Sequence, residues 1–221
     1  MNWEERETKK KTRAWLIDQL DFDRPIHYAG LPAAEALFET ELCERVSVKS
    51  MFLFEVDEAV HEQATQAVEA LRAHTPLISV WKYDVDEWIR TEGFPKTPKD
   101  FIWLDYCGYV NIRRLASLKK CIETMPEDGV VAATFLAMRE LKEQQDLLYV
   151  VGSKGQHVVG GEPTEKHLTR IRTVTNVGSS VGYPLRIKVL PYYDKSPMLL
   201  FVFSRKNVRR TTIEVLPQMK E

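Results

Sequence analysis

The 221-residue chain lacks several features that would assign it to a specialised class of protein. It has no apolar run of the roughly 18–20 residues that a membrane-spanning helix needs, so no membrane partner is expected. Its three cysteines are odd in number and show no C-x-x-C spacing, which favours reduced thiols in a cytoplasmic protein over a disulfide framework. Its formal net charge is only -1, which argues against a uniformly basic nucleic-acid binder but leaves room for local basic patches.

Several sequence motifs are missing as well. The five histidines form neither H-E-x-x-H nor H-x-x-E-H, so no metal site is predicted. The first predicted strand is followed by a single glycine, Gly30, in place of G-x-G-x-x-G. A nicotinamide-dependent oxidoreductase would need that glycine pattern and a proton donor, so this interpretation is disfavoured. The first residues, MNWEERETKKK, are charged and lack the apolar core of a secretory signal.

The hydrophobic pattern that is present alternates between two periods. Five apolar runs predict strands, at residues 26–29, 50–56, 76–83, 101–105 and 129–135. Stretches with helical spacing lie between them, at residues 31–46, 59–73, 85–91 and 112–125. Such alternation predicts an α/β fold with a doubly wound, mostly parallel sheet and helices on both faces.

The last third of the chain departs from this alternation. After a long irregular segment, 140–161, a helix is predicted at 164–177. Two strands follow at 185–190 and 198–203, joined by a segment, 191–197, that is short enough to connect antiparallel neighbours. The sheet should therefore end in a C-terminal antiparallel hairpin. Long loops commonly carry binding specificity, which makes 140–161 a candidate for substrate selection.

The most informative segment is FIWLDYCGY, residues 101–109. Four apolar residues run directly into Asp105, a pattern typical of a strand that is buried on both faces. In open α/β sheets, ligands bind at the carboxyl ends of the strands, so a carboxylate there suggests a functional role. Alternatively, Asp105 caps the helix that starts near Asn111, or it orders a turn.

Two further acids follow neighbouring strands. Glu55 ends the run SMFLFE, and Asp84 follows the run that ends in WKY. Because the carboxyl ends of parallel strands meet at one edge of the sheet, Glu55, Asp84 and Asp105 should form one constellation.

This order of elements, with an acid at the end of three successive strands, resembles the class I S-adenosylmethionine-dependent methyltransferases. The resemblance covers residues 24–206 and implies a Rossmann-like methyltransferase domain there, with a helical extension at 1–23 and a basic tail at 207–221. It implies S-adenosylmethionine as the cofactor. The family's glycine-rich turn is degenerate here, since only Gly30 remains.

The resemblance also implies roles for individual residues. Glu55 would bind the ribose hydroxyls, Asp84 would lie near the adenine amine, and Gly30 would approach the methionine end of the cofactor. A helix with Pro32 in its first turn would offer free backbone amides to a carboxylate. Asp105 would contact both cofactor and acceptor.

Asp105 and Tyr106 are the predicted catalytic residues, because this strand end faces the methyl acceptor in the family. They resemble the Asp-Pro-Pro-aromatic motif of enzymes that methylate amino groups of nucleic acids, without its prolines. Nucleic acid is therefore a possible acceptor and partner. Three basic clusters could contact phosphates or could simply be solvated: Lys9–Lys11; Arg113–Arg114 with Lys119–Lys120; and Arg205, Lys206, Arg209 and Arg210.

Two other interpretations remain open. Cys107 could attack a pyrimidine covalently, as in carbon-5 methylation, although buried cysteines are usually inert. The missing glycines also fit a catalytically degenerate, non-enzymatic Rossmann-like binding module. The sequence predicts neither the identity of the acceptor nor an oligomeric state.

Overall fold

The computed structural model describes residues 7–93, 99–106, 108–137, 158–159, 165–194 and 196–219. The strands are β1 (Ile26–Gly30), β2 (Val48–Glu55), β3 (Leu77–Lys82), β4 (Phe101–Asp105), β5 (Val130–Leu136), β6 (Val158–Val159), β7 (Arg186–Asp194), β8 (Ser196–Ser204) and β9 (Thr212–Val215). The helices are α1 (Glu7–Asp18), α2 (Leu37–Arg45), α3 (Glu58–Glu69), the 3-10 helix η1 (Ala70–Ala73), α4 (Val85–Thr91), α5 (Ile112–Thr124) and α7 (Glu165–Ser179).

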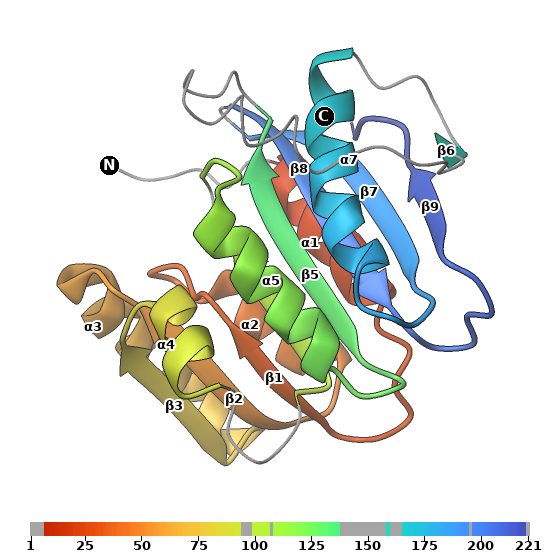
Figure 1. Cartoon of the computed structure of the whole chain (residues 1–221). Coiled ribbons are helices and arrows are strands. Elements are labelled where there is room, and N and C mark those ends of the chain that lie inside the picture. The colour runs from red at the N-terminus through yellow and green to blue at the C-terminus, as the bar shows by residue number, and fades with distance from the viewer. Residues whose placement is uncertain are drawn as a thin grey trace.

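All nine described strands join one sheet in the order β3-β2-β1-β4-β5-β8-β7-β9-β6 (Figure 1). The strands β1 to β5 pair in parallel, and β8 is inserted antiparallel between β5 and β7. The predicted doubly wound sheet with a C-terminal antiparallel hairpin is confirmed. The carboxyl ends of β1 to β5 define one edge of the sheet, here called the carboxyl edge, and their starts define the amino edge.

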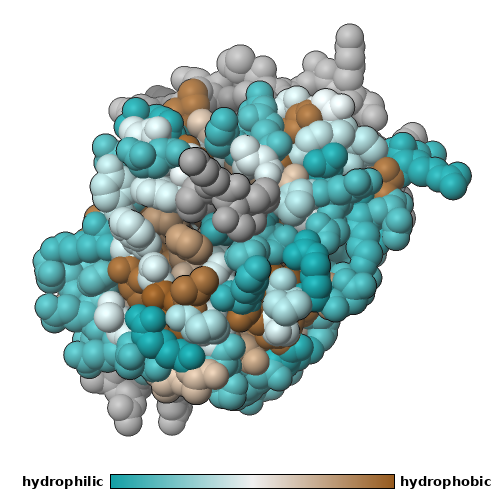
Figure 2. Space-filling view, turned by 90° about the horizontal axis from the view of Figure 1, so that it is seen from below, coloured by the Kyte–Doolittle hydropathy of each residue, from teal (hydrophilic) through white to brown (hydrophobic). Residues whose placement is uncertain are grey.

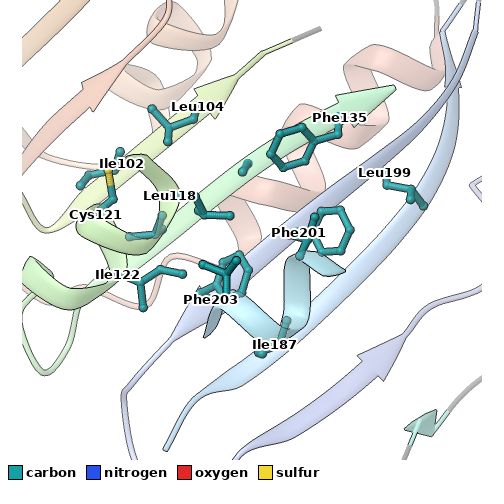
Figure 3. Packing of buried hydrophobic residues seen from close by; sticks show 14 of the residues in the cluster. Ile102, Leu104, Leu118, Cys121, Ile122, Phe135, Ile187, Leu199, Phe201 and Phe203 are labelled. Atoms are coloured by element: carbon teal, nitrogen blue, oxygen red, sulfur yellow. The ribbon is translucent and has the colours of Figure 1, made fainter. Parts of the chain in front are cut away.

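The two faces of the sheet carry separate hydrophobic cores. One core lies under α1, α2, α3 and η1 and includes Leu16, Phe38, Leu42 and Val68. The other lies under α4, α5 and α7, where side chains of α5 pack on β4, β5 and β8 (Figure 3). Each amphipathic helix therefore buries its apolar stripe against the sheet, as its spacing predicts.

The helix α4 covers only part of its face of the sheet. Its seven residues span about 10 Å, whereas the eight residues of β2 span about 26 Å. The helix starts at the carboxyl edge, because it follows β3 directly. The part of β2 and β3 near the amino edge is thus left without cover from this helix. Figure 2 shows the molecule from below, with mostly hydrophilic residues and an apolar group on the side of β2 and β3.

Two details of the predicted elements are wrong. The helix expected at 31–46 begins at Leu37, because Ala36 adopts a left-handed conformation (φ 45°, ψ 39°) that a helix cannot include. Pro32 therefore does not lie in the first helical turn. The segment 191–197, expected to be a loop, lies mostly in β7 and β8. Pro191 is tolerated there because β9 pairs with β7 only as far as Val189, which leaves that side of β7 without a neighbouring strand.

The first helix and the last strand of the described residues both pack onto or join the same sheet. From α1, Leu16 and Ile17 are buried in the core beneath α2. The strand β9 lies within the segment 207–221 and pairs in parallel with β7. The division into a helical extension, a central domain and a tail remains a prediction. Of the specificity segment 140–161, only β6 lies within the described residues.

None of the helices in the described part of the chain is long and apolar enough to cross a membrane.

Candidate functional site

The carboxyl edge brings together the residues that were predicted to bind a ligand. The strand order places Asp84, Glu55, Gly30 and Asp105 side by side along this edge, at the ends of β3, β2, β1 and β4. In the register, Gly30 lies between Leu53 of β2 and Trp103 of β4. Their side chains, however, have different surroundings.

Glu55 is half-buried and folds back onto the turn that follows β2. Its Oε1 accepts hydrogen bonds from the backbone amides of Val56 (2.7 Å) and Asp57 (2.8 Å). No bond from the described residues occupies Oε2. This arrangement fixes the carboxylate at the edge while it leaves one oxygen able to accept a hydrogen bond.

Asp84 is the N-cap of α4. Its Oδ1 accepts hydrogen bonds from the amides of Asp86 (2.9 Å) and Glu87 (3.2 Å), which satisfies amides that have no partner inside the helix. The guanidinium of Arg113, at the start of α5, lies 2.8 Å from the same oxygen. Asp84 therefore stabilises the starts of two helices, and a ligand would have to share it.

Tyr106 points toward α4 and α5. Its hydroxyl donates a hydrogen bond of 2.7 Å to the buried carboxylate of Asp86, and its ring stacks on Phe135 with 5.4 Å between the ring centroids. The guanidinium of Arg114 lies 4.9 Å from the centre of the Tyr106 ring. Burial, followed by the charge of Asp86, raises the pKa of the tyrosine well above its usual range. Its hydroxyl is thus a neutral donor that is already bonded.

Asp105 lies on the opposite face of β4. It continues the alternation of Phe101 and Trp103, whose rings contact Phe38 of α2. The predicted catalytic pair is therefore split, with Asp105 toward α2 and Tyr106 toward α4 and α5.

Asp105 neighbours a buried acid that the sequence analysis missed. Glu39, in the first turn of α2, is 1% exposed and accepts a hydrogen bond of 3.0 Å from the hydroxyl of Tyr28. Burial raises the pKa of Glu39 to about 7, and the negative charge of Asp105 contributes in the same direction. At neutral pH this carboxyl is therefore partly protonated, so it can hold or release a proton beside the end of β4. One signal was available, since Glu39 lies three residues from Ala36 and Leu42 on the inward side of the helix.

Gly30 is required for the packing of the Tyr28 side chain. The hydroxyl end of Tyr28, two residues earlier on β1, occupies the space where a side chain at position 30 would begin. Gly30 is not among the glycines with positive φ, so it does not supply a left-handed turn. The close approach that it permits is made by Tyr28, which is fully buried beside Phe38 and Phe101.

The basic clusters lie on different parts of the molecule. In the first, on α1, Lys11 forms an i,i+4 pair with Glu7. In the second, Arg113 and Arg114 are engaged with Asp84 and Tyr106 as described. The third cluster follows β8, which ends at the amino edge because it runs antiparallel to β5. There, Arg205 lies over the ring of Tyr183 (3.8 Å) and Lys206 pairs with Asp21 (2.8 Å).

Other predicted features are not tested. Cys107 lies outside the described residues. Within the described ranges, no group of three or more His, Cys, Asp or Glu side chains is placed to hold a metal ion. Cys121 is buried in the core under α5, where burial raises the pKa of its thiol and makes it unreactive (Figure 3).

No family model and no curated protein matches the sequence of this chain. Solved structures do match its architecture. An rRNA methylase from Streptococcus thermophilus is 11% identical, with a TM-score of 0.53 over 91% of this chain and 98% of that one. A precorrin-6y C5,15-methyltransferase from Geobacter metallireducens is 12% identical, with a TM-score of 0.56 over 92% and 94%.

The chain has the Rossmann-like class I methyltransferase fold. A spermidine synthase from Thermotoga maritima is also similar, at 15% identity and a TM-score of 0.52 over 86% of this chain and 58% of that one. The methyltransferase fold therefore carries more than one activity, and the activity of this chain has to be argued from its own site.

Proposed function

We propose that this protein binds S-adenosylmethionine at the carboxyl edge and transfers its methyl group. Glu55 carries this proposal. It ends β2, its carboxylate is held by two backbone amides, and no bond from the described residues prevents its Oε2 from accepting a hydrogen bond from a ribose hydroxyl. The methyltransferase fold and the adjacent strand ends at Gly30 and Asp105 support the same position for the cofactor.

Methyl transfer from a sulfonium depends little on acid–base catalysis. Displacement at a sulfonium methyl requires alignment of the acceptor more than proton transfer, so a site that holds two ligands in line is sufficient. Asp105 can accept a hydrogen bond from an acceptor amine, and Glu39 beside it can exchange a proton near neutral pH. We therefore assign the acceptor contact to Asp105, with Tyr106 as the residue that fixes the strand end through Asp86.

Calorimetry with S-adenosylhomocysteine, the product, tests the cofactor site. Because a charge-assisted hydrogen bond is worth about 1.5–3 kcal/mol, Glu55→Gln should weaken binding by roughly tenfold or more. Glu62→Gln is the matched control, since this residue is exposed on the neighbouring helix α3 and has the same charge. Equal affinity of Glu55→Gln and the wild type would remove Glu55 from the site.

A non-catalytic nucleoside-binding module is the second candidate. The observation that favours it is Tyr28, whose hydroxyl end fills the space beside Gly30 that a cofactor would approach in the family. Binding of S-adenosylhomocysteine without methyl transfer to any acceptor would support this candidate, and turnover would exclude it.

Nucleic acid is the acceptor we propose to test first. Lys10 and Lys11 lie near the start of α1. Because β1 follows α1 and starts at the amino edge, the end of α1 lies near the amino edge and its start lies nearer the carboxyl edge. Two similar structures are named as rRNA methylases, which supports trying RNA as well as DNA. Filter binding at two salt concentrations should show affinity that falls steeply with salt. The double variant Lys10→Glu, Lys11→Glu should bind more weakly than the wild type.

The control for that experiment is the pair Arg209→Glu, Arg210→Glu, which reverses the same number of positive charges at the opposite edge. An equal loss in both double variants would indicate a general charge effect. Absence of any binding at low salt would exclude a nucleic-acid acceptor and favour a small molecule or a protein.

A further inference from the structure

The amino edge holds an ammonium group that the proposed methyl transfer does not use. Lys99 lies directly before β4 and is only 2% exposed. Its Nζ has no hydrogen-bond partner among the described residues. It lies 3.6 Å from the centre of the Phe52 ring, so a cation–π contact is its main compensation. A buried ammonium without a hydrogen-bond acceptor is costly, which makes this lysine an exception that needs an explanation.

The adjacent carboxylate, Asp100, makes its hydrogen bonds to other groups and not to Lys99. Asp100 Oδ1 accepts a hydrogen bond from Arg24 (2.8 Å), and Asp100 Oδ2 accepts one from the backbone amide of His27 (2.7 Å). Arg24 also binds Asp128 at 2.7 Å. These bonds use both oxygens of Asp100, so its charge acts on Lys99 only through space and Lys99 Nζ has no hydrogen-bond acceptor among the described residues.

A second observation concerns the surface next to Lys99. On the face of β2 that carries Phe52, the row toward the amino edge consists of His27, Ser50 and Leu77, which are paired in the sheet register. His27 Nδ1 and Ser50 Oγ are 2.7 Å apart. This is the part of the face that α4 is too short to cover.

The open face also has an apolar component. Leu77 is 61% exposed and Trp81, farther along β3 on the same face, is 48% exposed. Figure 2 shows apolar residues gathered on this side of the molecule, within a surface that is otherwise mainly hydrophilic. A buried ammonium without a hydrogen-bond partner among the described residues thus lies on Phe52, and the strand of Phe52 also carries Ser50, which pairs with Leu77 in the register.

We propose that this face binds a small monocarboxylate with an apolar or aromatic body. The carboxylate would pair with Lys99 Nζ, with the Ser50 hydroxyl as a neighbouring donor, and the body would cover Phe52 and Leu77. A carboxylate fits because it supplies hydrogen-bond acceptors to Lys99 Nζ, for which the described residues offer none. Phosphate, which is partly dianionic at neutral pH, would bring more negative charge into the same buried position, next to Asp100.

The protonation of Lys99 adds a property that can be measured. Burial lowers the pKa of Lys99 to about 8, while Asp100 opposes this shift. The other charged or titratable groups near this face are His27, Arg24 and Lys49. Burial also lowers the pKa of His27, so the imidazole is mostly neutral at neutral pH and does not compete for the carboxylate. Affinity for the carboxylate should therefore fall as the pH rises through about 8, where Lys99 becomes neutral.

Calorimetric titration with benzoate tests the proposal, with benzyl alcohol as the neutral probe and inorganic phosphate, a mixture of monoanion and dianion at pH 7, as the second anion. For a ligand of this size we expect a Kd on the order of 0.1–1 mM at pH 7 for benzoate and much weaker binding of the other two. Lys99→Met should lower the benzoate affinity at least tenfold. Lys49→Met is the matched control, because Lys49 is exposed on β2, the strand of Phe52 and Ser50, and its loss changes the net charge equally.

Three results would overturn the proposal: no benzoate binding to the wild type, equal benzoate affinity in Lys99→Met, or preferred binding of phosphate. Lys99→Met should remain folded, because methionine places an apolar chain of similar length in a buried position, and a thermal melt without ligand verifies this. None of these readouts depends on S-adenosylhomocysteine binding, so failure of the carboxylate site leaves the proposal for the carboxyl edge standing, and the reverse also holds.

Discussion

The polar residues at the two edges of the sheet are satisfied in different ways, since helix amides bind them at the carboxyl edge and ion pairs such as Arg24–Asp100 bind them at the amino edge. At the carboxyl edge, Asp57 caps α3, Asp84 caps α4 and Asn111 caps α5, because all three helices begin there. At the amino edge helices end, so side chains there have no free helix amides to satisfy. Lys99 at the amino edge has no hydrogen-bond partner among the described residues. A polar residue that caps a helix is explained by the fold, whereas an unmatched one suggests a ligand.

This contrast changes the meaning of an acid at a strand end. In an alternating β–α chain, the residue after a strand is often also the residue before a helix, so capping alone produces a row of acids at one edge. Asp84 fits that explanation, because its Oδ1 is occupied by helix amides and by Arg113. Glu55 does not fit it fully, because its Oε2 has no bond from the described residues.

The largest effect is expected at Glu39, the buried acid of the carboxyl edge. Its pKa is raised from 4.5 to about 7, so between these values the folded protein keeps a proton that the unfolded chain has lost. Stability should therefore fall as the pH rises through this window, and the full cost is present above pH 7. Glu39→Gln removes the cost and should stabilise the protein by about 3 kcal/mol at pH 8, with little effect at pH 4.

Urea unfolding at several pH values measures this difference. Glu44→Gln, on the exposed side of the same helix, serves as the control and should show no such pH dependence. A Glu39→Gln variant with the same stability profile as the wild type would mean that Glu39 is ionised normally. The carboxyl edge would then hold no proton near neutral pH.

A smaller effect is expected at Gly30, where the explanations by packing and by cofactor binding diverge. A methyl group at this position would collide with the hydroxyl end of Tyr28, and overpacking of this kind costs about 1–3 kcal/mol. Gly30→Ala should therefore lower stability, and it should do so less in a Tyr28→Leu background, where the ring is absent. A double-mutant cycle by urea unfolding gives the coupling energy. Unchanged stability with loss of S-adenosylhomocysteine binding would instead assign Gly30 to the cofactor alone.

The sequence predicted the architecture well because periodicity is a local property. The runs FIWLD and VVAATFL are strands that are buried on both faces, and their spacing already implies the parallel sheet. Side-chain direction was harder to predict. Asp105 and Tyr106 are adjacent in sequence and were expected to share a pocket, but successive residues at a strand end face opposite sides.

Contacts between residues that are far apart in the sequence could not be predicted either, because no local pattern indicates them. Nothing local to Tyr106 indicates that its hydroxyl would bind Asp86, twenty residues earlier. Nothing local to Lys99 indicates that Asp100 would be occupied by Arg24, which lies before β1. The burial of both residues depends on how α4 and β4 are placed on the sheet, and this is settled only when the sheet assembles.

The smallest effect is expected at Lys99, and its sign with pH is opposite to that at Glu39. Because the pKa of Lys99 is lowered from 10.5 to about 8, the unfolded chain binds more protons than the folded one between these values. Stability should therefore rise with pH through this window, whereas Glu39 lowers it between pH 4.5 and 7. Lys99→Met should abolish this rise and stabilise the protein at pH 7 by on the order of 1 kcal/mol, since the ring face of Phe52 already offsets part of the cost. Unfolding of this variant and of Lys49→Met at pH 7 and pH 10 provides the measurement. If Lys99→Met is instead destabilised at pH 7 and the wild type shows no rise toward pH 10, the ammonium is satisfied in the folded protein and the contrast between the two edges disappears.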